Sequence, residues 1–353
     1  MKEATAMKYA IWSALRHRAV YVAVFVALAA TALSACAPPT RQNVGYHGPL
    51  PPQGVYEECP PRLGSPCLAR LRQIADAGFE LVLNYNLLGG NAAEIRAYVD
   101  QAHSLGVEVI WPLNNPVFWD GTDLRRYYSE LAESCRCPNN AGFISYVVDL
   151  AKGVPSTWGY YVGDELPGNQ HSSMKPYADL LKRLDPSHRQ LFVSSESASS
   201  RGSNLAPFAD TADVIGADYY PVGDSQPIVA TGDVARTIQA IANRYHKQSM
   251  MVLQAFSFGL IEGRAPKCFP LPGCARFPTA DEMRQMRDLV LINSHPQLIL
   301  WYSLHDISRS ADPSLYWANL VAAAGVHPRR PTSMQAGSAG RSCVNCPIAQ
   351  VGG

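Results

Sequence analysis

The chain has 353 residues, of which 47% are hydrophobic and 17% are charged, with 30 basic and 29 acidic side chains and a net charge of +1. This composition is typical of a globular protein with a large apolar core and excludes a disordered or collagen-like chain. The first 35 residues hold four basic side chains against Glu3, a net +3, so the rest of the chain carries −2. Without a basic excess, we expect no nucleic-acid partner.

The amino terminus has the pattern of an export signal. Lys8, Arg16 and Arg18 precede an apolar run over residues 19–33. A basic head followed by about 15 apolar residues, fewer than the ~20 of a spanning helix, predicts a secretory signal. The exit, Leu33-Ser34-Ala35-Cys36, resembles the bacterial lipobox. The alternative is an uncleaved anchor with a chance cysteine.

The lipobox resemblance implies cleavage before Cys36 and a lipid on its sulfur. Ala37, where an inner-membrane retention signal would have Asp, favours the outer membrane by the same analogy. We therefore expect a signal peptide over residues 1–35 and a tether over 36–42. The mature protein would be exported and lipid-anchored, at the outer membrane or cell surface or facing the periplasm.

The cysteine count agrees with export. Nine cysteines less Cys36 leave an even set that falls into close pairs. Exported proteins keep disulfides, so up to four bridges are expected, although eight cysteines allow 105 pairings. A zinc site at the last pair would need two further ligands that its neighbourhood does not supply, so no metal and no cofactor is expected. The pairs are Cys59 and Cys67, Cys135 and Cys137, Cys268 and Cys274, and Cys343 and Cys346.

Short β-branched and aromatic runs alternate with amphipathic stretches along the rest of the chain. The amphipathic stretches, over residues 68–77, 92–105, 233–245 and 279–292, predict helices. Several of the short runs are apolar nearly throughout, as expected for parallel strands covered by helices. The predicted strands are residues 43–47, 80–86, 107–113, 158–163, 190–195, 213–219, 250–255 and 298–303.

Eight strands with helical spacers predict an α/β fold of the (β/α)8 TIM-barrel type over residues 43–325. An open doubly wound sheet shows the same alternation, but it usually has fewer strands, and the sequence has no glycine-rich nucleotide motif after the first strand. The connections after the third and seventh strands are the longest and carry cysteine pairs, so disulfide-bearing loops are expected. Residues 326–353 are predicted to form an irregular, cysteine-containing tail.

Chemistry in such a barrel collects at the carboxyl ends of the strands. The side chains predicted there are aromatic rings, amides and carboxylic acids. Rings stack on the C–H face of a sugar, and amides and acids bind its hydroxyls. The predicted site residues are Tyr85, Asn114, Asp164, Glu165, Glu196, Asp218, Tyr219, Tyr220, Gln254 and Trp301.

The pattern resembles the large clan of barrel glycoside hydrolases with Asn-Glu-Pro at the end of strand four. The resemblance places Glu165 as general acid, with Asp164 tuning or orienting it, although Asp164 and Leu166 replace the Asn and Pro of the motif. The clan also has a Tyr ending strand six and a Trp ending strand eight. These positions match Tyr219 or Tyr220 and Trp301.

One departure puts the mechanism in question. Members of the clan carry a nucleophilic Glu at the end of strand seven, where this chain has Gln254, and an amide cannot form the glycosyl ester. The enzyme could invert configuration, or an N-acetyl group of the substrate could attack, since Gly163-Asp164-Glu165 resembles a hexosaminidase motif. Alternatively, another carboxylate serves. The candidates are Asp218, Glu196, Glu262 and Asp306.

Several of these residues also have a structural interpretation. Trp301 and the tyrosines can be core residues, because large aromatics fill barrels. Glu196 can cap a following helix, and His305 with Asp306 can be a structural pair. The sequence therefore predicts an exported glycoside hydrolase acting on a poly- or oligosaccharide. A carbohydrate-binding pseudoenzyme and a structural surface lipoprotein are the alternatives.

Overall fold

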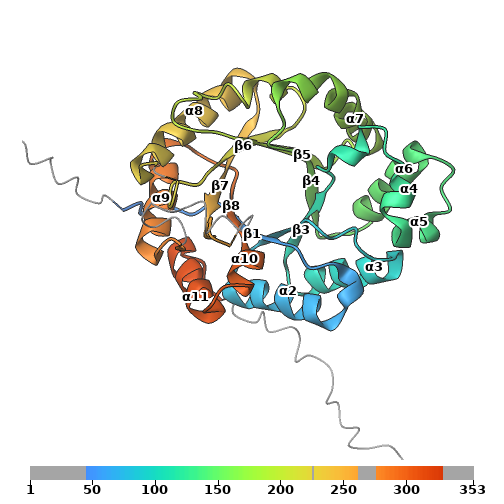
Figure 1. Cartoon of the computed structure of the whole chain (residues 1–353), viewed down its shortest axis with the longest axis horizontal. Coiled ribbons are helices and arrows are strands. Elements are labelled where there is room, and N and C mark those ends of the chain that lie inside the picture. Colours follow the sequence, from blue (N-terminus) through green and yellow to red (C-terminus); the bar gives the residue numbers. More distant parts are fainter. Residues whose placement is uncertain (1–44, 225, 261–275, 329–353) are drawn as a thin grey trace, which may run out of the picture. The chain divides into compact units, whose positions relative to one another are not determined.

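The computed structural model describes residues 45–224, 226–260 and 276–328. Eight parallel strands pair in sequence order and close into a barrel, with helices forming an outer ring (Figure 1). The predicted (β/α)8 TIM barrel is confirmed. The strands are β1 (Gln53–Glu57), β2 (Leu81–Asn84), β3 (Glu108–Pro112), β4 (Thr157–Asp164), β5 (Arg189–Ser195), β6 (Val214–Tyr219), β7 (Gln248–Gln254) and β8 (Leu298–Tyr302).

The first strand lies later in the chain than predicted. Residues 45–47 form no strand, and residues 43 and 44 lie outside the described residues. Instead β1 pairs with β2 and β8, for example Val55 with Val82 and with Trp301, and so closes the barrel. This run follows two prolines and has an acidic end, so its strand pattern is weak in isolation. All five of its residues are buried, because the barrel covers both faces.

The predicted amphipathic stretches form α2 (Ser65–Ala77), α3 (Ala92–Ser104), α8 (Thr231–Arg244) and α9 (Ala280–Asn293). The connection from β5 to β6 contains only a 3-10 turn, Ala206–Phe208, where the repeat would have a helix. The remaining helices are α4 (Leu124–Tyr127), α5 (Ser129–Cys135), α6 (Asn140–Lys152), α7 (His171–Leu184), α10 (Leu304–Ser308) and α11 (Pro313–Ala324).

Local signals set the helix ends. Asn91 caps α3: its side chain accepts hydrogen bonds from the backbone N–H groups of Ala93 (2.9 Å) and Glu94 (3.1 Å). The Glu94 carboxylate accepts one in return from the Asn91 N–H at 2.8 Å, completing a capping box. At the carboxyl end of α2, Gly78 adopts φ +97°, a left-handed conformation that glycine reaches without a Cβ penalty.

Buried side chains form two layers. One fills the barrel interior, and the other packs between the strands and the helices. Along β8 the two layers alternate: Leu298 and Leu300 belong to the interior, whereas Ile299 and Trp301 face the helices. This period of two decides which side chains at the strand ends can reach the barrel mouth.

Two of the cysteine pairs form disulfides. Cys59–Cys67 joins the segment after β1 to the first turn of α2, with 5.4 Å between the Cα atoms. Cys135 and Cys137 are also joined, in the long connection between β3 and β4. Several predicted features lie outside the described residues. They are the other two cysteine pairs, Cys36, Glu262, the predicted signal and tether, and the predicted tail from residue 329 onward. Among the described helices, none has the length and apolarity to cross a membrane.

Candidate active site

The carboxyl ends of the strands surround a cavity of about 370 Å³. Seven of the predicted site residues line it: Tyr85, Asp164, Glu165, Glu196, Asp218, Tyr219 and Tyr220. The structure adds residues that sequence analysis did not select, chiefly Tyr56, Asp224, Gln226, Phe256, Phe258 and Tyr302.

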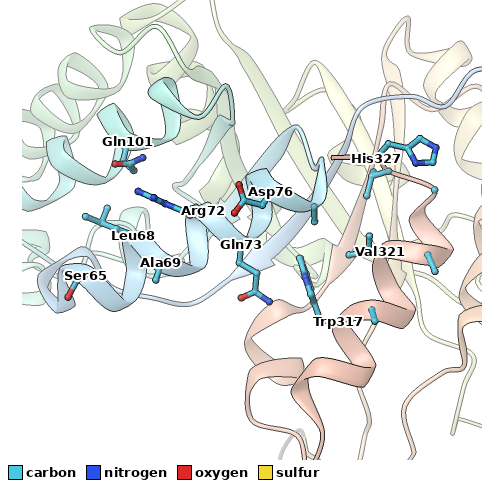
Figure 2. Close-up of a pocket in the computed structure, with 15 residues that line it drawn as sticks. Ser65, Leu68, Ala69, Arg72, Gln73, Asp76, Gln101, Trp317, Val321 and His327 are labelled. Atoms are coloured by element: carbon cyan, nitrogen blue, oxygen red, sulfur yellow. The ribbon is translucent and has the colours of Figure 1, made fainter. Parts of the chain in front are cut away.

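A larger hollow, of about 1150 Å³, lies on the outside of the barrel between α2 and α11 (Figure 2). Leu68, Trp317 and Val321 give it a mostly apolar wall, with Arg72 and Asp76 among its polar residues. It is formed by helix surfaces and not by strand ends, where the chemistry of barrels is found. The smaller cavity is therefore the candidate active site.

Asp164, the last residue of β4, is held by two tyrosines. The Tyr161 hydroxyl donates to its Oδ1 at 2.6 Å and the Tyr85 hydroxyl to its Oδ2 at 2.7 Å. Burial raises the pKa of Asp164 to about 6. The two tyrosine hydroxyls stabilise the carboxylate and lower this pKa, whereas the charge of Glu165 raises it further. The side chain therefore exchanges its proton in mildly acidic solution.

The tyrosines around Asp164 form a connected network. The Tyr56 hydroxyl donates to the Tyr161 hydroxyl at 3.4 Å, which in turn donates to Asp164. Burial, followed by the charge of Asp164, raises the pKa of Tyr85 and Tyr161 well above the usual value. These phenols therefore stay protonated and act as fixed hydrogen-bond donors that orient the carboxylate.

Glu165 follows in a left-handed backbone conformation, with φ +48°. Non-glycine residues adopt this region rarely, at about 1–3 kcal/mol of strain, and often at functional sites. Its exposed carboxyl group lies beside that of Asp218 of β6, which is only 5% exposed. Burial and then this contact with Glu165 raise the pKa of Asp218 well above the usual value. Asp218 therefore holds its proton more tightly than an ordinary aspartate does.

The two tyrosines that end β6 face different layers. Tyr219 is buried against the helices, and its hydroxyl donates to the Pro227 carbonyl at 3.2 Å. Tyr220 hydrogen-bonds to Asp218 and packs edge-on against Phe256, with 4.9 Å between ring centroids. Of the two, Tyr220 is therefore the ring available to a ligand, whereas Tyr219 supports the loop.

Trp301 does not line the cavity, contrary to the sequence-based expectation. It is 0% exposed, in the layer between strands and helices, and its Nε1 donates to Gln53 Oε1 at 2.9 Å. The next residue, Tyr302, faces the cavity, with its ring centroid 5.1 Å from that of Tyr56 and 6.0 Å from that of Tyr220. Neighbouring side chains on a strand face opposite sides, so a shift of one residue changes the assignment.

Gln254 is fully buried and is not among the cavity-lining residues. Its Oε1 accepts from the Val222 N–H and its Nε2 donates to the Val222 carbonyl, both at 2.8 Å. A further bond of 3.3 Å runs from Nε2 to the Phe256 carbonyl. The amide thus anchors the loop after β6, a structural role in place of the expected contact with substrate.

Glu196 borders the cavity, but its carboxylate organises the loop that follows β5. It is 6% exposed and accepts hydrogen bonds from the backbone N–H groups of Leu205 (2.8 Å), Gly202 (3.2 Å) and Asn204 (3.2 Å), and from the Ser200 hydroxyl. Glu196 therefore has a structural role, as expected from one interpretation of the sequence, but it anchors a loop and does not cap a helix.

A second cavity, of about 390 Å³, adjoins the first and shares Tyr85 and Asp164 with it. Asn114 lines this second cavity, together with Glu58. Burial raises the pKa of Glu58, against the opposing effect of His305, whose Nε2 lies 3.5 Å from Glu58 Oε2. Sequence analysis missed Glu58 because it placed the first strand too early.

Asp306, another carboxylate that the sequence offered for the site, has a structural role. Asp306 is buried at the start of α10 and accepts a 2.5 Å hydrogen bond from the Ser303 hydroxyl, so it supports that turn. Within residues 45–224, 226–260 and 276–328, no cluster of three or more histidine, cysteine, aspartate or glutamate side chains is arranged to hold a metal ion.

Comparison with known proteins supports the fold. No family model matches the chain, and no curated protein matches it. Among solved structures, it is similar to a proposed alpha-L-fucosidase from Bacteroides thetaiotaomicron, with 11% identity over 80% of this chain and 96% of that chain and a TM-score of 0.53. It is also similar to a cold-adapted beta-galactosidase from Rahnella sp. R3, with 11% identity over 80% of this chain, 56% of that chain and a TM-score of 0.51. At this identity the likeness establishes the barrel fold.

Proposed function

We propose that the protein is a glycoside hydrolase that cleaves a poly- or oligosaccharide. The observation that carries the proposal is the gathering of three carboxyl side chains, Glu165, Asp218 and Asp164, in one cavity at the carboxyl end of the barrel. Glycosidases depend on carboxyl groups for proton transfer and for stabilising an oxocarbenium-like transition state. The names of the two barrel proteins described above, a fucosidase and a galactosidase, are in keeping with this activity.

In this proposal Glu165 is the general acid. Its exposed carboxyl group faces the cavity, whereas buried Asp218 keeps a proton beside it. Glu165 starts the reaction protonated and gives that proton to the leaving oxygen, and the water that attacks the sugar carbon releases one proton, which restores the acid. Asp164, fixed by its two tyrosines, presents negative charge to the sugar as positive charge develops. Asp218 and Asp164 are thus the supporting carboxyl groups of the site.

The adjoining cavities suit a substrate with more than one sugar unit. Tyr85 and Asp164 form the boundary between them, so one sugar can lie on each side of the catalytic carboxyls. The rings of Tyr220 and Tyr302 supply stacking faces in the first cavity. In the second, the amide of Asn114 supplies hydrogen bonds to hydroxyl groups.

Gln254 favours a second candidate, a carbohydrate-binding protein without hydrolytic activity. The amide occupies the position where the resembling clan has its nucleophile, and its hydrogen bonds are used by Val222 and Phe256. In the substrate-assisted alternative, an acetamido N–H would add to an Asp164 oxygen that already accepts one tyrosine hydroxyl.

The test is Glu165→Gln, which keeps the shape of the side chain but removes its proton. We expect turnover of an ordinary glycoside to fall by ~10²–10⁴-fold, the usual contribution of general acid catalysis. Glycosides with very acidic leaving groups need little protonation and should lose much less. Glu133→Gln, an exposed position on α5, is the matched control. If wild-type protein binds a broad glycan panel but cuts none, the binding protein replaces the hydrolase.

We also propose that the mature chain begins at a lipidated Cys36 and is held at the outer membrane or cell surface. The support is the lipobox-like Leu33-Ser34-Ala35-Cys36 sequence. Cys36→Ser should move the protein from the detergent phase to the aqueous phase in detergent partitioning, because one acyl anchor point is removed. Wild-type protein that already partitions into the aqueous phase would contradict lipidation.

A further inference from the structure

The charge of the active-site cavity is strongly one-sided. Asp164, Glu165, Glu196, Asp218 and Asp224 line it, and none of its described lining residues is lysine, arginine or histidine. The whole chain has almost equal numbers of basic and acidic residues, 30 and 29, so the acidic excess is local. A concave site lined by one sign of charge concentrates its field and attracts ligands of the opposite sign.

Hydrolysis alone does not account for all of this charge. Glu165 and Asp218 belong to the proposed acid–base group, and Glu196 binds the loop after β5. Asp224 is different, because its carboxylate is exposed at the cavity. It accepts a hydrogen bond of 3.0 Å from the side-chain amide of Gln226. Neither acid–base chemistry nor packing of the barrel requires a carboxylate there.

The aromatic walls favour the same sign of charge. The rings of Tyr85, Tyr220 and Tyr302 line the cavity and are partly exposed. The face of an aromatic ring attracts a cation within about 6 Å, an effect that desolvation strengthens. Rings and carboxylates around one small cavity therefore form a site suited to a positively charged group.

The second cavity carries no opposing charge. Its described lining residues include the carboxyl groups of Glu58 and Asp164 and the neutral amides of Asn86 and Asn114, but no basic side chain. Among the described lining residues, a uronate, sulfated or phosphorylated sugar would therefore meet carboxylates in both cavities, and the nearby His305 is already placed beside Glu58, at 3.5 Å. Like charges at such short range oppose binding.

We propose that the substrate is a glycan with free, protonated amino groups, and that the ammonium of one amino sugar lies among Asp164, Asp224 and the tyrosine rings. This inference rests on the proposed hydrolase function and specifies its substrate class. A neutral sugar would keep the stacking contacts but lose the ionic ones. An N-acetylated sugar would lose its charge and bring an added acyl group.

The experiment compares β-1,4-linked oligomers of glucosamine, N-acetylglucosamine and glucose, and a uronate oligomer, each of the same length. Binding to wild-type protein is measured by calorimetry at low salt and at a pH just above 6, so that Asp164 keeps its charge, and cleavage is measured by chromatography of the same samples. We expect the glucosamine oligomer to bind at least about tenfold more tightly than the glucose oligomer, the factor that about 1.4 kcal/mol provides. Added salt should reduce this preference, because it screens the charges.

Asp224→Asn tests the proposed ammonium contact. It should lower the preference for the glucosamine oligomer over the glucose oligomer several-fold. Asp149→Asn, which removes an exposed aspartate on the outer helix α6, is the matched control and should leave the preference unchanged. An unchanged preference in Asp224→Asn would overturn this contact.

The outcomes separate the two proposals. If glucose oligomers are cleaved and glucosamine oligomers bind no better, the amino-sugar inference is wrong and the hydrolase stands. If glucosamine oligomers bind preferentially but no glycan is cut, the inference holds for a binding protein and the hydrolase is wrong. If no oligomer binds or is cleaved, both are overturned.

Discussion

Three carboxylic acids in one cavity acquire different properties from their surroundings. Asp164 is fixed by two tyrosine hydroxyls, Asp218 is buried against Glu165, and Glu165 itself reaches solvent. Burial disfavours the charged form, whereas hydrogen bonds donated by phenols favour it. Identical chemical groups can thus divide proton donation and charge stabilisation between them, which is the arrangement that acid–base catalysis needs.

The pKa of Asp164 predicts a pH dependence of stability. The value of about 6 in the folded protein lies above the ordinary 3.8, so the folded state binds this proton more tightly than the unfolded state. The stabilising contribution is therefore complete below about pH 4 and is lost as pH rises through 6. Wild-type protein should therefore lose up to about 3 kcal/mol of its free energy of unfolding between pH 4 and pH 7 through this group, and Asp164→Asn should not show this loss.

Urea denaturation of both proteins across this pH range measures the change. Asp149→Asn on the exposed face of α6 is the control, since it removes an exposed aspartate that pairs with Lys152. A difference between Asp164→Asn and wild type that stays constant with pH would show that burial does not perturb Asp164 in the way described.

At the scale of elements, Gln254 couples β7 to the loop after β6. Its amide matches both the N–H and the carbonyl of Val222, a pairing that requires one donor and one acceptor on the same side chain. The loop that it holds carries Asp224 to the cavity. The position that would supply a nucleophile in the resembling clan is therefore used here to shape the site.

Gln254→Glu should destabilise the protein and should not create a nucleophile. The carboxylate would face the carbonyls of Val222 and Phe256 without a proton to donate, in a fully buried position. We expect a loss of about 2–4 kcal/mol in the free energy of unfolding, measured by urea denaturation. Gln73→Glu, on the exposed face of α2, is the control. A stable Gln254→Glu protein with increased turnover would contradict the anchoring role.

At the scale of the whole molecule, closure of the barrel depends on a polar connection in an apolar layer. Trp301 of β8 donates to Gln53 of β1, and Gln53 Nε2 donates at 2.7 Å to the Ala324 carbonyl at the end of α11. The first and last strands and the last helix are joined in this way. Buried polar groups that lose such partners are costly, so the connection contributes to cooperative folding.

Trp301→Phe tests this placement against a sugar-binding role. The change removes the indole N–H and leaves a small void, so the free energy of unfolding should fall by about 1–3 kcal/mol. Glycan affinity, measured by calorimetry on the folded protein, should stay close to wild type. Tyr302→Leu should show the opposite pattern, because that ring faces the cavity. A large affinity loss in Trp301→Phe with normal stability would contradict the structure.

The sequence by itself determined the barrel and much of the site. Seven of the eight strands overlap the predicted segments, because apolar runs and amphipathic periods are local properties of the chain. Glu165 and Asp218 were both predicted to lie at the carboxyl end of the barrel, although they are distant in sequence, because parallel strands bring their carboxyl ends to one edge. Tyr85, Asp164 and Tyr220 followed from the same rule.

Only the tertiary structure decided the first strand and the direction of side chains at the strand ends. β1 has a weak local pattern and is recognised by its pairing with β2 and β8. Both faces of a barrel strand are buried, so hydrophobicity does not reveal which face points inward, and Trp301 and Tyr302 could not be told apart. The role of Gln254 likewise depends on Val222, thirty-two residues away, since a hydrogen bond between loops is a property of the folded chain.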